Sequence, residues 1–89
     1  MRHATSETLN EIEPLLERLR SVPGLVEKKP GIFYRKSKAF LHFHEDPSGL
    51  HADVRFEDEF ERVRAETDVE REALMARVRA VQLVPLPRR

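Results

Sequence analysis

The sequence contains no cysteine and no tryptophan, and only three of its 89 residues are glycine. Without cysteine the chain cannot form disulfides, thiolate nucleophiles or zinc sites with sulfur ligands. A metal ion would have to be bound by histidine, aspartate or glutamate. Gly24, Gly31 and Gly49 are scattered, and the absence of a phosphate-binding loop or dinucleotide fingerprint argues against nucleotide-dependent chemistry. The serines occur at expected caps and turns rather than in a nucleophile motif, so we expect a binding protein rather than an enzyme.

The chain also lacks an excess of charge of one sign, since 16 basic side chains balance 16 acidic ones. This balance argues against a protein whose affinity comes mainly from nucleic-acid phosphates. Long apolar runs are missing as well. No run is long enough to cross a bilayer, and the first residues lack the apolar core of a signal peptide. We therefore expect a cytoplasmic location and no membrane partner.

Residues 1–89 are expected to form a single domain, because a chain of this length has room for one core and little surplus stability. Self-association, for example as a homodimer, would bury further apolar area. The apolar end of the chain, "VQLVPLPRR", either packs on its own sheet or is bound by a neighbouring subunit.

Two amphipathic helices are predicted from apolar residues spaced three and four apart. The first begins near residue 11 and ends at "SVPG"; its apolar side comprises Leu9, Ile12, Leu15, Leu16, Leu19 and Val22. Asn10 and Glu13 match a capping box at its start, and Thr67 and Glu70 match a second one before a helix that runs to about residue 81.

Three strands are predicted between the helices, over residues 31–36, 38–45 and 50–57. The second and third alternate strictly, and "DPSG" between them matches a type I turn, so they form a hairpin. The predicted register opposes Leu41 to Val54 and Phe43 to Ala52 on the core side. On the other side it opposes His42 to Asp53, His44 to His51 and Phe40 to Arg55.

The predicted fold class is α+β: a two-layer sandwich of a helix, a three-stranded antiparallel sheet and a second helix, with both helices on the Leu41 and Val54 side. The segment "VPGLVEKKPGIFYRKSKAFLHFHED", the strand after it and "TDVEREALMARV" resemble the small bacterial MmcQ/YjbR-type proteins. The likeness covers about residues 19–81. It implies a compact sheet-and-helix fold of the double-wing type, discussed as DNA-binding, and it transfers no catalytic residue.

Three of the four histidines lie in the hairpin and suggest a metal site. Histidines two residues apart on a strand point the same way, and residues of the paired strand could converge with them on one ion. The predicted ligands are His42, His44, His51 and Asp53, a set that suits zinc, nickel or copper. The alternative interpretation is a solvated or interface face without an ion.

The same face of the sheet is predicted to carry a binding or interface surface. Its residues are Phe33, Arg35, Phe40, His42, His44, Asp53 and Arg55, with both phenylalanines covered by the C-terminal tail or by a partner subunit. We therefore expect an interaction or small-ligand-binding domain, with metal binding as the alternative hypothesis. A third hypothesis is weak nucleic-acid binding through Lys28, Lys29, Arg35, Lys36 and Lys38.

Overall fold

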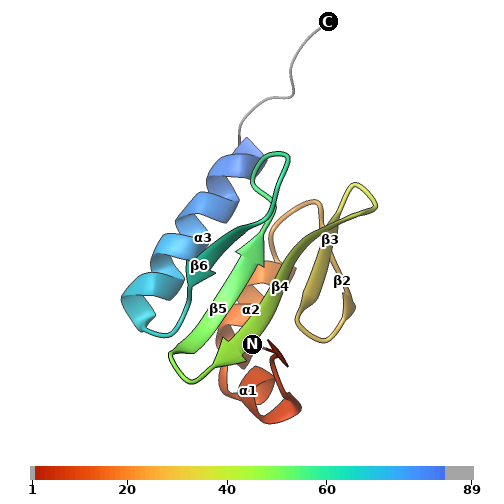
Figure 1. Ribbon diagram of the computed structural model, residues 1–89. Coiled ribbons are helices and arrows are strands. Elements are labelled where there is room, and N and C mark those ends of the chain that lie inside the picture. The colour runs from red at the N-terminus through yellow and green to blue at the C-terminus, as the bar shows by residue number, and fades with distance from the viewer. Residues whose placement is uncertain (1, 84–89) are drawn as a thin grey trace, which may run out of the picture.

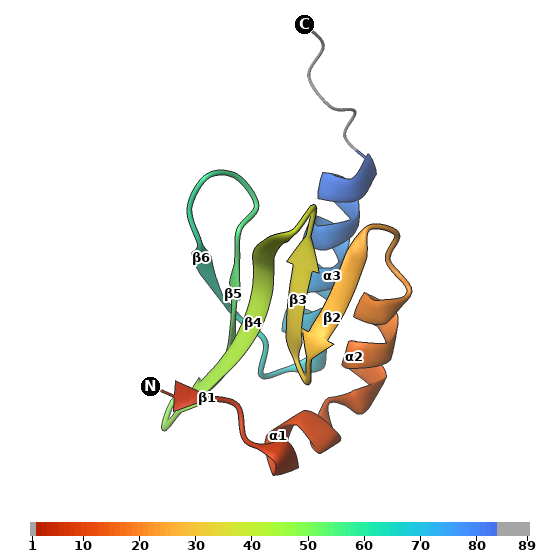
Figure 2. The same ribbon diagram turned by 90° about the vertical axis from the view of Figure 1, so that its right-hand side faces the viewer.

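The computed structural model describes residues 2–83, and within that range helices cover one face of an antiparallel sheet (Figure 1, Figure 2). In chain order the elements are β1 (Arg2–His3), α1 (Ser6–Glu11), α2 (Glu13–Arg20), β2 (Leu25–Lys29), β3 (Ile32–Arg35), β4 (Lys38–Asp46), β5 (Gly49–Val54), β6 (Glu61–Arg64) and α3 (Asp68–Leu83). The α+β class and the antiparallel sheet are confirmed.

The sheet has more strands than the three predicted from the sequence. Its order is β2-β3-β4-β5-β6, and β1 pairs with β4 outside this path. The additional strands carry little alternation: β2 reads "LVEKK", β6 reads "ERVR", and β1 has only two residues. β2 and β6 lie at the sheet edges, where a strand can form by backbone pairing without burying one of its sides. Such strands therefore need no alternating sequence pattern.

The hairpin of β4 and β5 has the predicted register. Leu41 opposes Val54 and Phe43 opposes Ala52, while His42 opposes Asp53 and His44 opposes His51. Asp46 begins the turn, and its carboxylate accepts hydrogen bonds from the backbone N and the hydroxyl of Ser48, at 2.9 and 2.6 Å. The histidines therefore lie on the face opposite the core.

The exposed position predicted for Phe33 and Phe40 is wrong. Phe33 pairs with Leu41 and has no exposed surface, and Phe40 is 3% exposed. The register between β3 and β4 shifts at this point, since Phe33 opposes Leu41 while Tyr34 opposes Ala39. Phe40 is thus the extra residue of a β-bulge, which breaks the alternation and turns its ring into the core.

Of the two predicted capping boxes, the structure contains the second but not the first. Asn10 and Glu13 do not form the predicted capping box, because Thr5 caps α1 and the chain breaks at Ile12 before α2 begins with a proline in its first turn. The second box is confirmed: Thr67 Oγ1 accepts from Glu70 N at 3.1 Å, and Glu70 Oε1 accepts from Thr67 N at 3.0 Å.

The core lies between the sheet and the two helices α2 and α3, as the view in Figure 2 shows. Leu41 and Val54 from the sheet are fully buried there, as are Leu19 of α2 and Leu74 of α3. Arg18 of α2 donates to Glu72 of α3 at 2.5 and 3.1 Å across the outer side of the helix pair. Because both helices pack on the core side of the sheet, they leave its histidine face uncovered.

Among residues 2–83 the structure contains no helix that is long and apolar enough to cross a membrane.

Candidate metal centre

The fourth histidine, His3, is brought to the histidine face by the short strand β1. β1 pairs with the end of β4, where His3 opposes His44 and Arg2 opposes Glu45. Ala4 N then donates to Phe43 O at 3.2 Å, which holds the N-terminal segment along β4. This contact could not be predicted from the sequence, because two residues are too few for a periodic pattern.

Glu45 fixes the chain that follows β1. Its carboxylate accepts from Thr5 N at 2.7 Å and from the Thr8 hydroxyl at 2.9 Å. Because Thr5 also caps α1, the same residue joins the start of the helix to the end of β4. The position of His3 is therefore set by the backbone on one side and by a carboxylate anchor on the other.

His3, His42 and His44 form one group, which we call the histidine cluster. Each offers a ring nitrogen, and these nitrogens lie within 4.8 Å of one another. The rings of His3 and His44 are stacked with centroids 4.7 Å apart, and His42 Nδ1 lies 2.9 Å from His44 Nε2. Two nitrogens on a tetrahedral zinc ion are roughly 3.4 Å apart for zinc–nitrogen distances of about 2.0–2.1 Å. Small side-chain rotations would bring the three imidazoles onto one ion.

Asp53 lies beside the cluster and is held by Arg62. Arg62 donates to both carboxylate oxygens, at 2.8 and 3.0 Å, and Asp53 Oδ2 lies 3.3 Å from His44 Nε2. The hydrogen bond from Arg62 lowers the pKa of Asp53 below its usual range, although burial opposes this. The carboxylate is therefore charged near neutral pH and lies against the same His44 nitrogen that faces His42.

The pKa of His42 is lowered by burial and by the neighbouring His44. The opposing influence of Asp53 is smaller. A neutral imidazole keeps a lone pair on one ring nitrogen, which is the form that binds a metal ion. Near pH 7 the environment of His42 thus favours the protonation state of a ligand.

The structure does not bring His51 into the cluster. It opposes His44 across the hairpin and Arg64 on β6, is 8% exposed, and its Nδ1 has no hydrogen-bond partner among the described residues. Strand neighbours on a flat ribbon point outward in parallel, so opposition alone does not make two side chains converge. The predicted ligand set therefore changes: His3 replaces His51, and Asp53 stands next to the imidazoles.

Phe60, in the loop between β5 and β6, is a further residue that the sequence did not indicate. Its ring lies edge-on to His42 with centroids 5.2 Å apart, and the Arg55 guanidinium lies 4.5 Å from its centroid. Phe60 is 40% exposed. It therefore covers one side of the cluster with an apolar ring.

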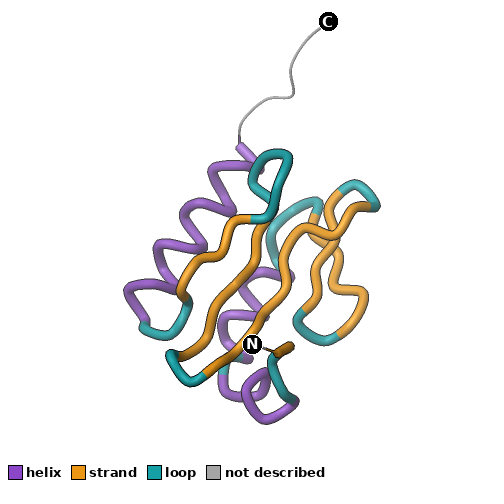
Figure 3. Tube along the Cα trace, in the orientation of Figure 1, coloured by secondary structure: helices purple, strands orange, loops and turns teal. Residues whose placement is uncertain are grey.

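The predicted binding surface is divided between the two ends of the sheet. Arg35, Phe40 and Arg55 lie near the turn between β3 and β4, whereas His44 lies near the other end of β4. Figure 3 shows the loops before and after β4 at opposite ends of this strand. The basic residues are divided too, because Lys28 and Lys29 stand at the β2–β3 turn and Lys36 and Lys38 at the β3–β4 turn.

No protein-family model matches the chain, and neither a curated protein nor a solved structure gives a significant match. The resemblance to the MmcQ/YjbR-type proteins therefore stays a prediction.

Proposed function

We propose that this protein is a divalent-metal-binding domain in which His3, His42 and His44 are the ligands. The meeting of three imidazoles from β1 and β4 carries the proposal. Zinc, nickel and copper suit such a nitrogen donor set. Asp53, fixed by Arg62, supports it as a carboxylate held beside the imidazoles, 3.3 Å from His44 Nε2.

Three protein ligands leave a position on a tetrahedral ion for water or for an atom of a small ligand. The proposal thereby includes the small-ligand binding expected from the sequence and gives that ligand a point of attachment. Phe60 would lie beside such a ligand, because its ring contacts His42 and is partly exposed.

Self-association and a cytoplasmic location stay predictions. Two of the three supports for self-association are lost, since Phe33 and Phe40 are core residues. The third, the tail "VPLPRR", lies outside the described residues. Nucleic-acid binding loses support because the basic residues lie at two ends of the β2–β3 hairpin.

Calorimetric titration of chelator-treated protein with zinc and nickel tests the proposal. The protein should carry no tag at its N-terminus, because His3 is a proposed ligand. We expect one ion per chain with submicromolar affinity. Loss of a second-shell partner already costs about 10–100-fold in metal affinity, so His3→Ala, His42→Ala and His44→Ala should each cost at least that much.

His51→Ala is the matched control, because it removes an imidazole from the same face of the sheet but not from the cluster. Its affinity for zinc should equal that of the unaltered protein. The absence of binding, or an equal loss in His51→Ala and His3→Ala, would refute the assignment of ligands.

A further inference from the structure

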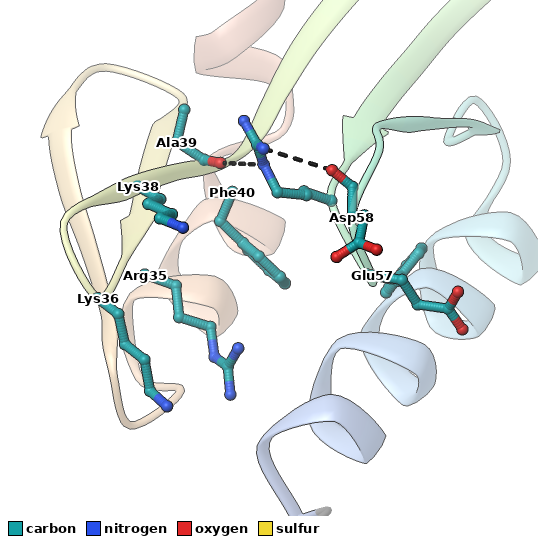
Figure 4. Close-up of a pocket in the computed structure, with 9 residues that line it drawn as sticks. Arg35, Lys36, Lys38, Ala39, Phe40, Glu57 and Asp58 are labelled. Carbon is teal, nitrogen blue, oxygen red and sulfur yellow. Dashed lines mark hydrogen bonds between the residues drawn. The ribbon is translucent and has the colours of Figure 1, made fainter. Parts of the chain in front are cut away.

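A second candidate site lies at the other end of the sheet, between the β3–β4 turn and the loop that follows β5 (Figure 4). We call it the turn hollow; it has a volume of about 310 Å³ and is lined by Arg35, Lys36, Lys38, Ala39, Phe40, Arg55, Phe56, Glu57 and Asp58. Lys38 is six residues from His44 along β4, which is roughly 20 Å at about 3.3 Å per residue. The turn hollow shares no residue with the histidine cluster, but its Arg55 lies against Phe60, whose ring contacts His42.

The floor of the hollow is aromatic and firmly supported. The rings of Phe40 and Phe56 meet edge to face with centroids 6.5 Å apart. The Arg77 guanidinium lies 4.1 Å from the centroid of Phe56, and it donates to both carboxylate oxygens of Glu61, at 2.8 and 2.9 Å. The bulge in β4 turns Phe40 into the core, so this residue is 3% exposed and closes the bottom of the hollow.

One wall of the hollow is cationic and comes from a tight turn. Lys36 and Ser37 form the two-residue connection between β3 and β4, with φ of 54° and 69°. The left-handed backbone region is unfavourable for a residue with a side chain, so this turn is strained. The strained turn directs Arg35, Lys36 and Lys38 to one side of the hollow (Figure 4). Among the described residues, neither lysine forms a salt bridge.

The opposite wall contains a fixed guanidinium and acidic side chains. Arg55 Nε donates to Ala39 O at 3.1 Å, so this side chain is held across the hollow. Asp58 presents its carboxylate from the side opposite Lys38, as Figure 4 shows. Four basic residues against two acidic ones leave the lining positive, but the acidic side repels a continuous chain of phosphates.

We propose that the turn hollow binds a small organic anion in which one carboxylate or phosphate group is attached to a flat apolar ring. The ring would lie against the partly exposed Phe56 above the buried Phe40, and the anionic group would face Lys36 and Lys38. The volume is at the lower end of the range for small-molecule sites, about 300–1,000 Å³, and fits a ligand of that size. Binding in the turn hollow would not require an ion in the histidine cluster.

Nuclear magnetic resonance titration of ¹⁵N-labelled protein tests the proposal with phenyl phosphate, benzoate and inorganic phosphate. We expect phenyl phosphate or benzoate to shift the amide signals of residues 35–40 and 55–58. Comparing the two compounds shows whether the site prefers a phosphate or a carboxylate group. Inorganic phosphate, which lacks a ring, should bind at least about tenfold more weakly, since ring burial contributes about 25 cal/mol per Å². Equal binding of inorganic phosphate and phenyl phosphate, or no localised shifts with either ring compound, would overturn the proposal.

Two double variants with the same change in net charge separate a site from general charge attraction. Lys36→Ala with Lys38→Ala should weaken binding about tenfold, because two charge-assisted contacts are lost. Lys28→Ala with Lys29→Ala, at the far end of β3, should change it by less than about twofold at physiological salt. Equal effects of the two variants would contradict the site, and so would tighter binding of a single-stranded oligonucleotide that also shifts the amides of Lys28 and Lys29.

Discussion

Asp53 is a charged residue on the sheet face that the fold has almost buried, and its partner Arg62 makes that possible. The carboxylate is 8% exposed and accepts two hydrogen bonds from the guanidinium. An unpaired buried carboxylate would be costly, so the pair must form for the hairpin and β6 to adopt their places. Because of this pair, Asp53 stays negatively charged beside the histidines at neutral pH.

The pH dependence of stability should reflect this pair. Because the hydrogen bond from Arg62 lowers the pKa of Asp53 in the folded protein, the folded state binds fewer protons there than the unfolded state. The contribution is complete above the unfolded value of about 3.9 and is lost as the pH falls through the lower folded value. Asp53→Asn should lower the free energy of unfolding by about 1–2 kcal/mol at pH 7, since Arg62 is half exposed and solvent screens the pair.

Urea denaturation from pH 7 to pH 2.5 checks this expectation. The difference between the two proteins should shrink below about pH 4, as Asp53 becomes protonated. Glu61→Gln serves as the control, because Glu61 also accepts two hydrogen bonds from an arginine but on the exposed surface, so it should have a smaller effect. A constant difference at every pH would be inconsistent with the role given to Asp53.

Ser37 offers a second test at the scale of one residue. Its φ of 69° belongs to the left-handed region, where glycine has no steric cost. Ser37→Gly should therefore raise the free energy of unfolding by about 0.5–1 kcal/mol, after allowance for the larger entropy of glycine in the unfolded chain. Ser48→Gly, in the two-residue turn between β4 and β5, should lower it, because Ser48 has no positive φ and donates its hydroxyl to Asp46. Chemical denaturation of both variants gives the comparison.

At the scale of elements, two sequence patterns that look alike have different outcomes. Thr67 and Glu70 form the predicted capping box of α3, whereas Asn10 and Glu13 form none. The difference arises because Thr5 caps the chain earlier and Ile12 ends α1 before α2 starts. A capping pattern indicates a helix start only where the chain has not already begun a helix upstream.

Thr67→Ala should lower the free energy of unfolding by about 1 kcal/mol, because it leaves the Glu70 N–H without its side-chain acceptor. Asn10→Ala should change it by less than about 0.5 kcal/mol, since Asn10 is exposed and caps nothing. The midpoints of urea unfolding at neutral pH provide the measurement. Equal losses in the two variants would show that the contact at Thr67 does not stabilise α3.

The sequence predicted best where a long segment has one periodicity and a clear turn. Residues 38–54 alternate and are joined by "DPSG", so the full register of β4 with β5 could be deduced. Edge strands such as β2 and β6 need no alternation, and the bulge at Phe40 depends on the neighbouring strand, so neither could be deduced. The same limits apply to the site: His42 and His44 were found from spacing, while His3 reaches them only through tertiary pairing.

At the scale of the whole molecule, the two candidate sites occupy opposite ends of one sheet. The histidine cluster lies where β1 joins β4, and the turn hollow lies where β3 turns into β4 (Figure 1). The strand β4 contributes to both, and its central residues Leu41 and Phe43 are buried against the helices. A rigid central strand thus separates two more exposed ends.

Zinc should stabilise the whole fold if the metal centre is correctly assigned. An ion present at 100 times its dissociation constant contributes about 2.7 kcal/mol, which corresponds to a rise in melting temperature of roughly 10–20 °C for a domain of this size. The rise should be smaller at pH 5.5 than at pH 7.5, because protons compete for the imidazoles. Because the pKa of His42 is lowered, protons should displace the ion from this residue only at a lower pH than from an ordinary histidine.

Differential scanning fluorimetry over a series of zinc concentrations measures this effect. His3→Ala should strongly reduce the rise at a given zinc concentration, and His51→Ala should retain it. A rise of the same size in His3→Ala would place the ion elsewhere on the protein.

The pairing of β1 with β4 also determines how an ion would distinguish the folded chain from the unfolded one. His3 and His44 are 41 residues apart in the sequence, and an ion bound to both would close a ring of that length. In an unfolded chain the closure of such a ring costs roughly 4 kcal/mol of chain entropy. The folded chain has already closed the ring through its backbone. In a protein without cysteine, the bound ion would thus act as a reversible cross-link that only the native topology can form.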